Sequence, residues 1–135
     1  MILVDTSAWI DYLRASDTAV AAELTALIID GADLATTEAV VMELLAGGGT
    51  PARADAIEKL TNGLPLLGTD PRFDFRQAAS VFLAARRSGR TVRSLVDCLI
   101  AAVSLRHDVP LLHKDADYDA IASCLPLRIH PVDRR

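Results

Sequence analysis

The segment MILVDTSAWIDYL, residues 1–13, holds the pattern that decides the fold. After Met1 comes the uninterrupted apolar run Ile-Leu-Val, which is typical of a short strand buried on both faces of a parallel sheet. Asp5 follows the run directly, and Thr6 or Ser7 can cap a helix that begins near Ala8. The segment therefore predicts a buried strand, a carboxylate at its carboxyl end and a helix behind it.

Beyond this segment, short apolar runs continue to alternate with longer helical patterns. The further runs that we expect to form strands are 33–36, 64–67, 109–112 and 127–129. Caps, periodicity and glycine breaks predict helices that open at Asp17 or Thr18 and at Thr37, and helices over 51–60, 70–87, 94–105 and 115–124. This alternation predicts one α/β domain over residues 1–135, with a central parallel sheet of four to five strands and helices on both faces.

The composition suits one globular domain, since 51% of the residues are hydrophobic and 24% are charged. Acidic residues outnumber basic ones by 18 to 14, and the net charge of −4 argues against a uniformly basic nucleic-acid binder. Two cysteines are too few for a disulfide scaffold, and the first residues lack the pattern of a signal peptide. No apolar run is long enough to cross a membrane, so we expect a cytoplasmic protein.

Four carboxylates occupy positions where a parallel sheet places its ligand site, beyond the carboxyl ends of the strands. Asp5 and Asp115 follow or nearly follow predicted strands, Glu43 lies beside the apolar face of a helix, and Asp97 interrupts an apolar stretch. Each also has a purely structural explanation: Asp5 and Asp115 can cap helices, Glu43 can be solvated, and Asp97 can form a capping box with Ser94.

If the four carboxylates converge, a bound cation is the simplest way to stabilise them. Like charges a few ångströms apart cannot all remain ionised unaided. Oxygen ligands without histidine or cysteine favour Mg²⁺, with Mn²⁺ as a substitute. Such ions lower the pKa of water and offset the charge that develops on a phosphodiester, which favours hydrolysis of a phosphodiester bond.

With these acids in this order, the sequence resembles the PIN-domain nucleases, and more narrowly the VapC toxins of bacterial type II toxin–antitoxin pairs. Four segments carry the resemblance: MILVDTSAWIDYL, TEAVVMELLAG, TVRSLVDCLIAA and LLHKDADYDAI. The resemblance implies a Mg²⁺-dependent endoribonuclease that cuts structured RNA, such as transfer or ribosomal RNA, and so inhibits translation and growth. It also implies neutralisation by a cognate VapB-type antitoxin, a homodimer, and a larger assembly with the antitoxin.

Carried over position by position, the resemblance gives each acid a role. Asp5, Glu43, Asp97 and Asp115 match the catalytic metal ligands, and Asp117 matches a further acid that ligates through water or supports a second ion. The last motif departs from the family pattern in two places. His113 stands where the family usually has Thr or Ser, and Tyr118 stands where it often has Phe.

Contacts to RNA are expected beside the acids. Five arginines and no acid lie between Phe75 and Val96: Arg76, Arg86, Arg87, Arg90 and Arg93. Arg93 and Ser94 immediately precede the helix that carries Asp97, so the guanidinium, the hydroxyl and the helix N-terminus can face a phosphate. We also assign Thr6 and His113 to substrate contact, with a solvated helix end as the alternative for Arg86, Arg87 and Arg90.

Other site classes fit poorly. The acids at 115, 117 and 119 open like a calcium loop, but Ala120 and Pro126 replace its glycine and its last glutamate. The glycines at 47–49 lack the Lys-Ser/Thr of a P-loop, and the histidines lack zinc-protease spacing. A second hypothesis remains: a catalytically silent PIN-like module whose acidic cleft only docks a basic partner. For either, we expect an antitoxin segment to cover an apolar groove between the early helices.

Overall fold

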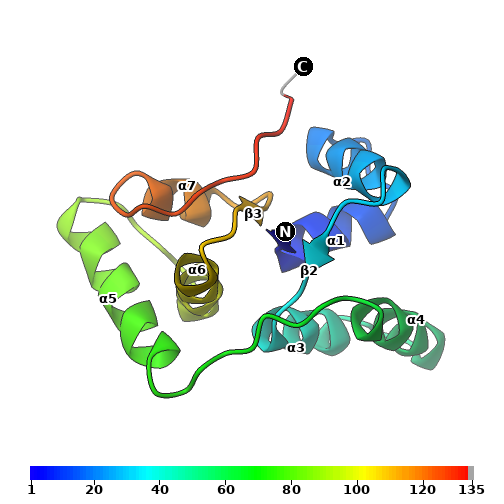
Figure 1. Ribbon diagram of the computed structural model, residues 1–135, viewed down its shortest axis with the longest axis horizontal. Coiled ribbons are helices and arrows are strands. Elements are labelled where there is room, and N and C mark those ends of the chain that lie inside the picture. The colour runs from blue at the N-terminus through cyan, green and yellow to red at the C-terminus, as the bar shows by residue number, and fades with distance from the viewer. Residues whose placement is uncertain (134–135) are drawn as a thin grey trace.

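The structure is a computed structural model, and it describes residues 1–133. The strands are β1 (Ile2–Val4), β2 (Leu34–Ala35) and β3 (Leu111–Leu112). The helices are α1 (Thr6–Leu13), α2 (Ala19–Ile29), α3 (Glu38–Ala46), α4 (Pro51–Asn62), α5 (Asp74–Arg87), α6 (Leu95–His107) and α7 (Ala116–Ala122). Figure 1 shows α5, α6 and α7 on one side of the strands and α1 and α2 on the other.

The sheet is parallel, as the sequence predicts, and its order is β2-β1-β3. Ile2 lies opposite Leu34, and Val4 lies opposite Leu112. The chain leaves β1 toward one neighbour through α1 and α2, and it reaches the other neighbour only after α6. β1 is therefore the switch point at which the connections diverge, and the residues after β1 and β3 flank the crevice that this topology creates.

The predicted count of four to five strands is wrong. The segments 64–67 and 127–129 do lie along the two edges of the sheet, but each contributes a single bridge, Thr36 to Leu66 and Leu111 to Ile129. Proline explains part of this, since Pro65 has no N–H to donate to a ladder. The pairing of 64–67 consists of the Thr36 N–H bond to the Pro65 carbonyl at 3.0 Å and the Leu67 N–H bond to the Thr36 carbonyl at 2.8 Å.

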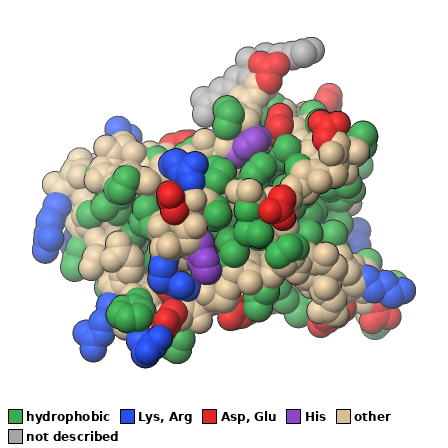
Figure 2. All heavy atoms as spheres, in the orientation of Figure 1, with side chains coloured by type: hydrophobic (Ala, Val, Ile, Leu, Met, Phe, Trp, Pro, Cys, Tyr) green, Lys and Arg blue, Asp and Glu red, His purple; other side chains and the backbone are tan. Residues whose placement is uncertain are grey.

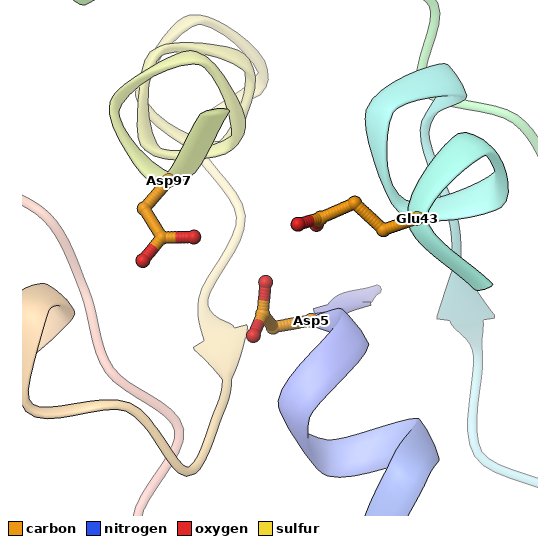
Figure 3. Close-up of side chains that lie close together, drawn as sticks. All are labelled: Asp5, Glu43 and Asp97. Atoms are coloured by element: carbon orange, nitrogen blue, oxygen red, sulfur yellow. The ribbon is translucent and has the colours of Figure 1, made fainter. Parts of the chain in front are cut away.

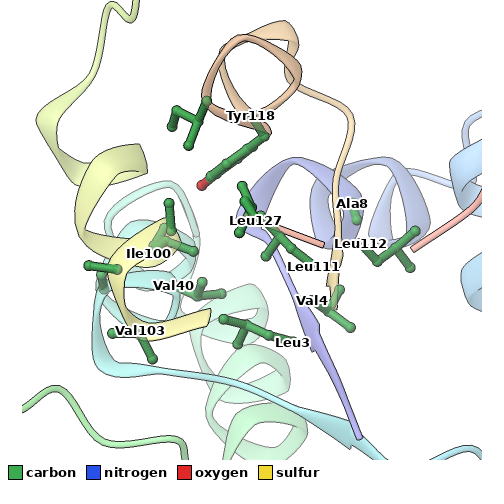
Figure 4. Packing of buried hydrophobic residues seen from close by; sticks show 14 of the residues in the cluster. Leu3, Val4, Ala8, Val40, Ile100, Val103, Leu111, Leu112, Tyr118 and Leu127 are labelled. Carbon is green, nitrogen blue, oxygen red and sulfur yellow. The ribbon is translucent and has the colours of Figure 1, made fainter. Parts of the chain in front are cut away.

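The core lies between the strands and α6. Leu3, Val4, Leu111 and Leu112 are fully buried on the strands, and Ile100 and Val103 of α6 pack in the same cluster (Figure 4). The α6 segment is apolar on nearly every side, and its burial confirms that such a helix belongs inside. Since this packing holds α6 in place, it also fixes the position of Asp97, which lies in the first turn of that helix.

Two predicted helix starts need correction. α1 begins at Thr6 and not near Ala8, because Asp5 is its N-cap and accepts the N–H of Ser7. α5 begins at Asp74 and not at residue 70, because the residues before it form a turn in which Phe73 and Asp74 donate to the Asp70 carbonyl. The predicted helix 115–124 is shorter as well: α7 ends at Ala122.

A buried ion pair joins α5 to α6. Asp74 is 1% exposed, and the Arg106 guanidinium donates to both of its carboxylate oxygens at 2.9 Å. Arg106 also donates to the Gly68 carbonyl, so one side chain links α6 to the start of α5 and to the segment before it. Burial raises the pKa of Asp74, but the bonds from Arg106 outweigh it and hold that pKa below its usual value.

Both cysteines are free thiols, and Cys98 is fully buried while Cys124 is half-buried. This agrees with the prediction that they act as small apolar residues. Within residues 1–133, no helix has the length and apolar character needed to cross a bilayer.

Candidate metal centre

Five acids from four separate stretches of the sequence meet at the carboxyl edge of the sheet, in two overlapping groups. Asp5, Glu43 and Asp97 form one group, and Asp97, Asp115 and Asp117 form the other. Within each group, one carboxylate oxygen from each residue lies within 4.8 Å of the others. Figure 3 shows Asp5, Glu43 and Asp97 pointing from the end of β1, from α3 and from α6 toward a common space.

Asp5 is both the N-cap of α1 and a member of the cluster. Its Oδ2 accepts the N–H of Ser7 at 2.9 Å and the hydroxyl of Ser7 at 2.5 Å. Its Oδ1 faces the other side and accepts the Tyr118 hydroxyl at 2.6 Å. The sequence leaves capping and a site role as alternatives for Asp5, but the two coexist, because a carboxylate has acceptor positions on both oxygens.

Glu43 projects from α3 and is held by α1. The Thr6 hydroxyl donates to its Oε1 at 2.7 Å. Partial burial raises the pKa of Glu43, the Thr6 bond opposes this shift, and the charges of Asp5 and Asp115 add to it. Thr6, which the sequence assigns to substrate contact, therefore positions a cluster acid in the structure.

Asp97 belongs to both groups, and the charges of several neighbouring acids act on it. It lies in the first turn of α6, and the Ser94 hydroxyl caps that turn by accepting the Asp97 N–H at 3.4 Å. Burial, a hydrogen bond with Asp115 and the charges of Asp5, Asp115 and Glu43 together raise its pKa to about 8. Without a cation, Asp97 therefore keeps its proton to a higher pH than a free aspartate does.

The second group sits at the start of α7. Asp115 is the N-cap of this helix and accepts the Asp117 N–H at 2.9 Å. Asp117 is buried and accepts the Arg93 N–H at 3.0 Å, with Arg93 Nε 3.7 Å from its other oxygen. The Arg93 side chain is 77% exposed, so it places a cation at the rim of the cluster.

His113 is turned into the protein. Its Nδ1 accepts the Asp115 N–H at 3.0 Å, and its Nε2 lies 3.4 Å from Asp119. Since Nδ1 accepts a hydrogen bond it carries no proton, and burial lowers the pKa of the ring accordingly. The ring is 8% exposed and packs against Tyr118, so in this structure His113 shapes the loop that presents Asp115.

The structure separates the five arginines that lie between Phe75 and Val96 in the sequence. Arg86, Arg87 and Arg90 are exposed at the carboxyl end of α5 and after it. Arg76 instead lines a hollow with Leu105 and Arg106 at the opposite end of α6 from Asp97. Eight residues of helix separate Leu105 from Asp97, which is about 12 Å along the axis. On the face in Figure 2, basic side chains stand apart with acidic ones among them, and no continuous basic band is seen.

Sequence reasoning misses the cluster roles of two residues. For Ser7 it predicts only a possible helix cap, whereas the hydroxyl joins the cluster to the loop before α7 by bonding Asp5 and accepting the Lys114 N–H at 2.8 Å. For Tyr118 it finds only a departure from the family pattern. A polar atom on a side chain expected to be apolar is the signal that could have revealed its role.

The donor set fits a hard divalent cation. Every member of the two groups is a carboxylate, and this all-oxygen chemistry suits Mg²⁺ or Mn²⁺. The raised pKa of Asp97 agrees with this, because burial and, to a smaller extent, the neighbouring carboxylates disfavour its ionised form, and a bound cation would favour it. Asp5, Glu43 and Asp97 would hold such an ion, and Asp115 and Asp117 lie where they could support it.

Comparison with known proteins identifies the family to which the chain belongs. The sequence profile of the PIN domain matches residues 2–123. The chain is 47% identical to Ribonuclease VapC11 of Mycobacterium tuberculosis over 123 residues. These residues make up 90% of this chain and 92% of that relative.

Solved structures agree. VapBC-5 of Mycobacterium tuberculosis, a member of the VapBC family of toxin–antitoxin systems, is 27% identical with a TM-score of 0.68 over 94% of each chain. FitAcB of Neisseria gonorrhoeae shares the fold, with a TM-score of 0.72 over 97% of each chain at 22% identity.

Proposed function

This chain belongs to the PIN-domain family, in which VapC ribonucleases are its relatives, and from that premise we propose that it is the ribonuclease toxin of a VapBC-type toxin–antitoxin pair. Its activity is Mg²⁺-dependent endonucleolytic cleavage of a structured RNA, transfer or ribosomal, which inhibits translation and growth. Such a substrate would place the activity in the cytoplasm. The observation that carries the proposal is the convergence of five acids from the end of β1, from α3, from α6 and from the start of α7 at the switch point of the sheet.

The chain's own residues prepare the site in distinct ways. Ser7 and Tyr118 fix Asp5, and Thr6 fixes Glu43. The rigid, buried α6 fixes Asp97, and the exposed guanidinium of Arg93 is available to a phosphate beside the acids. A divalent cation held there supplies Lewis acidity, which favours the ionised form of an attacking water and offsets the charge that develops on the phosphodiester.

Mapping RNA ends in cells tests this function. After induction of the chain, new 5′ ends should accumulate at a small number of positions in one class of structured RNA. Induction of the Asp97→Ala variant at equal protein level should leave those positions intact. Unchanged RNA ends in both cultures, or the same new ends in both, would refute the proposal.

The antitoxin is proposed to bind over an apolar groove beside Glu43. A cavity of about 310 Å³ lies between α1, α3 and α4, with apolar walls from Ile10, Leu44 and Ile57 and with Glu43 on its border. A segment of a VapB-type antitoxin that fills this groove can place a basic side chain on the acids. Charge reversal at Glu43 should therefore weaken co-purification of the cognate antitoxin, and undiminished co-purification would contradict the contact.

We also propose that the chain forms a homodimer, and a larger assembly with its antitoxin. Met42 and Leu66 are 56% and 55% exposed and line one hollow beside α3, where a second copy can bury them. Light scattering of the purified chain should give twice the 14.5 kDa of one copy. A single-copy mass at micromolar concentration would contradict the dimer.

A further inference from the structure

Tyr118 brings a hydroxyl into the acidic cluster from a side chain that is otherwise part of the core. The residue is fully buried on α7, and Figure 4 shows its ring among the apolar residues that surround the strands. Its hydroxyl lies 2.6 Å from Asp5 Oδ1 and 3.3 Å from Asp97 Oδ1. A single O–H thus lies between two acids that come from β1 and α6, far apart in the sequence.

The hydrogen bonds to Asp5 determine which of its electron pairs remain free. A carboxylate offers about four acceptor positions, two on each oxygen. Ser7 occupies both positions on Oδ2, through its N–H and its hydroxyl. Tyr118 occupies one of the two on Oδ1, at the shorter of its two distances. Asp5 therefore has one free position, on Oδ1, and it can ligate a cation only through that oxygen.

The same hydroxyl fixes where that oxygen lies relative to Asp97. Because the ring is held in the core and packs against His113 at 5.0 Å between centroids, the hydroxyl cannot move freely. Asp5 Oδ1 at 2.6 Å and Asp97 Oδ1 at 3.3 Å therefore share this hydroxyl as a common neighbour. Outer partners that orient a ligating carboxylate typically contribute tenfold to a hundredfold to metal affinity.

We propose that Tyr118 is a positioning residue, whose hydroxyl presets Asp5 and Asp97 for a small divalent cation that each binds through one oxygen. This inference rests on the proposed function, since it assumes that the cluster is a metal site. A phenylalanine at this position would fill the same core space without ordering the two carboxylates. Part of the free energy of cation binding would then be needed to bring the two carboxylates together, so the cation would bind more weakly.

Mn²⁺ titration of the full purified chain, followed by the electron paramagnetic resonance signal of free Mn²⁺, tests the proposal. Tyr118→Phe should raise the dissociation constant about tenfold while far-ultraviolet circular dichroism, which reports the backbone fold, stays unchanged. The matched control is Tyr12→Phe, since the other tyrosine of the chain packs edge-on against Trp9 and lies outside the cluster. It should bind Mn²⁺ as the wild type does. Equal affinity in all three proteins would overturn the role of Tyr118 and leave the metal centre intact.

Two further measurements separate the possible failures. If the wild type binds no Mn²⁺, or if Asp97→Asn binds it equally well, the metal centre itself is refuted and this inference falls with it. If Tyr118→Phe does not fold, 3-fluorotyrosine in the wild-type sequence gives two ¹⁹F resonances, one for each tyrosine. Addition of Mg²⁺ should shift the Tyr118 resonance and leave that of Tyr12 in place. A Tyr118 resonance that Mg²⁺ does not move would overturn the proposal.

Discussion

At the scale of the residue, the cluster shows how one side chain can satisfy a structural and a chemical role together. Asp5 and Asp115 cap helices with one part of the carboxylate and join an acidic group with the rest. The sequence identifies these acids because each lies at a position where folding alone requires only an apolar or a capping residue. It cannot identify Ser7 and Tyr118 as their partners, because those hydrogen bonds depend on the packing of α1 and α7 against the sheet.

Asp97→Asn should stabilise the metal-free protein more at pH 8 than at pH 5. The pKa of Asp97 is raised from 3.8 to about 8 in the folded state, so between these values the folded chain holds a proton that the unfolded chain has released. The free energy of unfolding therefore falls as pH rises through this window, and the asparagine removes that loss.

Thermal denaturation in EDTA at the two pH values checks this prediction. We expect the melting temperature of the variant to exceed that of the wild type by about 2–8 °C at pH 8, and by a smaller margin at pH 5. A variant that is less stable than the wild type at pH 8 would show that the fold does not disfavour the ionised form of Asp97.

At the scale of the element, most helices are predictable and the edge strands are not. Helix periodicity and caps are local properties, so α3, α4 and α6 appear close to where the sequence predicts them. Whether 64–67 and 127–129 form strands depends on pairing with a distant partner, and each makes only one bridge. The sequence predicts the start of α5 too early, because a turn around Asp70 has the same local composition as a helix start.

Arg106→Ala should destabilise the packing of α5 on α6 far more than Arg72→Ala. Loss of Arg106 leaves Asp74 buried without its charged partner, although the Asp70 N–H still donates to it, and we expect this loss to cost about 2–4 kcal/mol. Arg72 pairs with Asp70 at 3.1 Å, but its side chain is 78% exposed and the pair is screened by water, so its loss should leave stability nearly unchanged. Urea denaturation of both variants measures the difference. Equal losses would mean that the Asp74 pair does not anchor α5.

At the scale of the whole molecule, the net charge of −4 hides an uneven distribution. Five of the 18 acids lie together in one buried or half-buried cluster, and exposed arginines follow the helix that packs beside it. Composition alone argues against a nucleic-acid partner, because it averages over positions that the fold separates. The same averaging makes the arginines look like one stripe, whereas Arg76 lies at the far end of α6.

Arg87→Ala and Arg90→Ala should weaken RNA binding, and Arg76→Ala should not. Arg87 and Arg90 are exposed and precede Arg93 in the sequence, and the exposed side chain of Arg93 contacts Asp117 of the cluster. Removal of one arginine that binds a phosphate should reduce the slope of log affinity against log salt by about one. Binding to a structured RNA in EDTA, at several salt concentrations, measures this slope without cleavage. An equal effect at Arg76 would mean that the RNA crosses the whole of α5.

The most direct test of the account is cleavage of a structured RNA by the purified chain free of antitoxin, with Mg²⁺ and with EDTA. The account predicts site-specific cleavage with Mg²⁺, no cleavage in EDTA, and recovery when Mn²⁺ is restored. It predicts no cleavage by Asp5→Asn under any of these conditions, although that variant should still fold. Cleavage in EDTA, or full activity of Asp5→Asn, would contradict the claim that the acids at the switch point form a metal-dependent nuclease site.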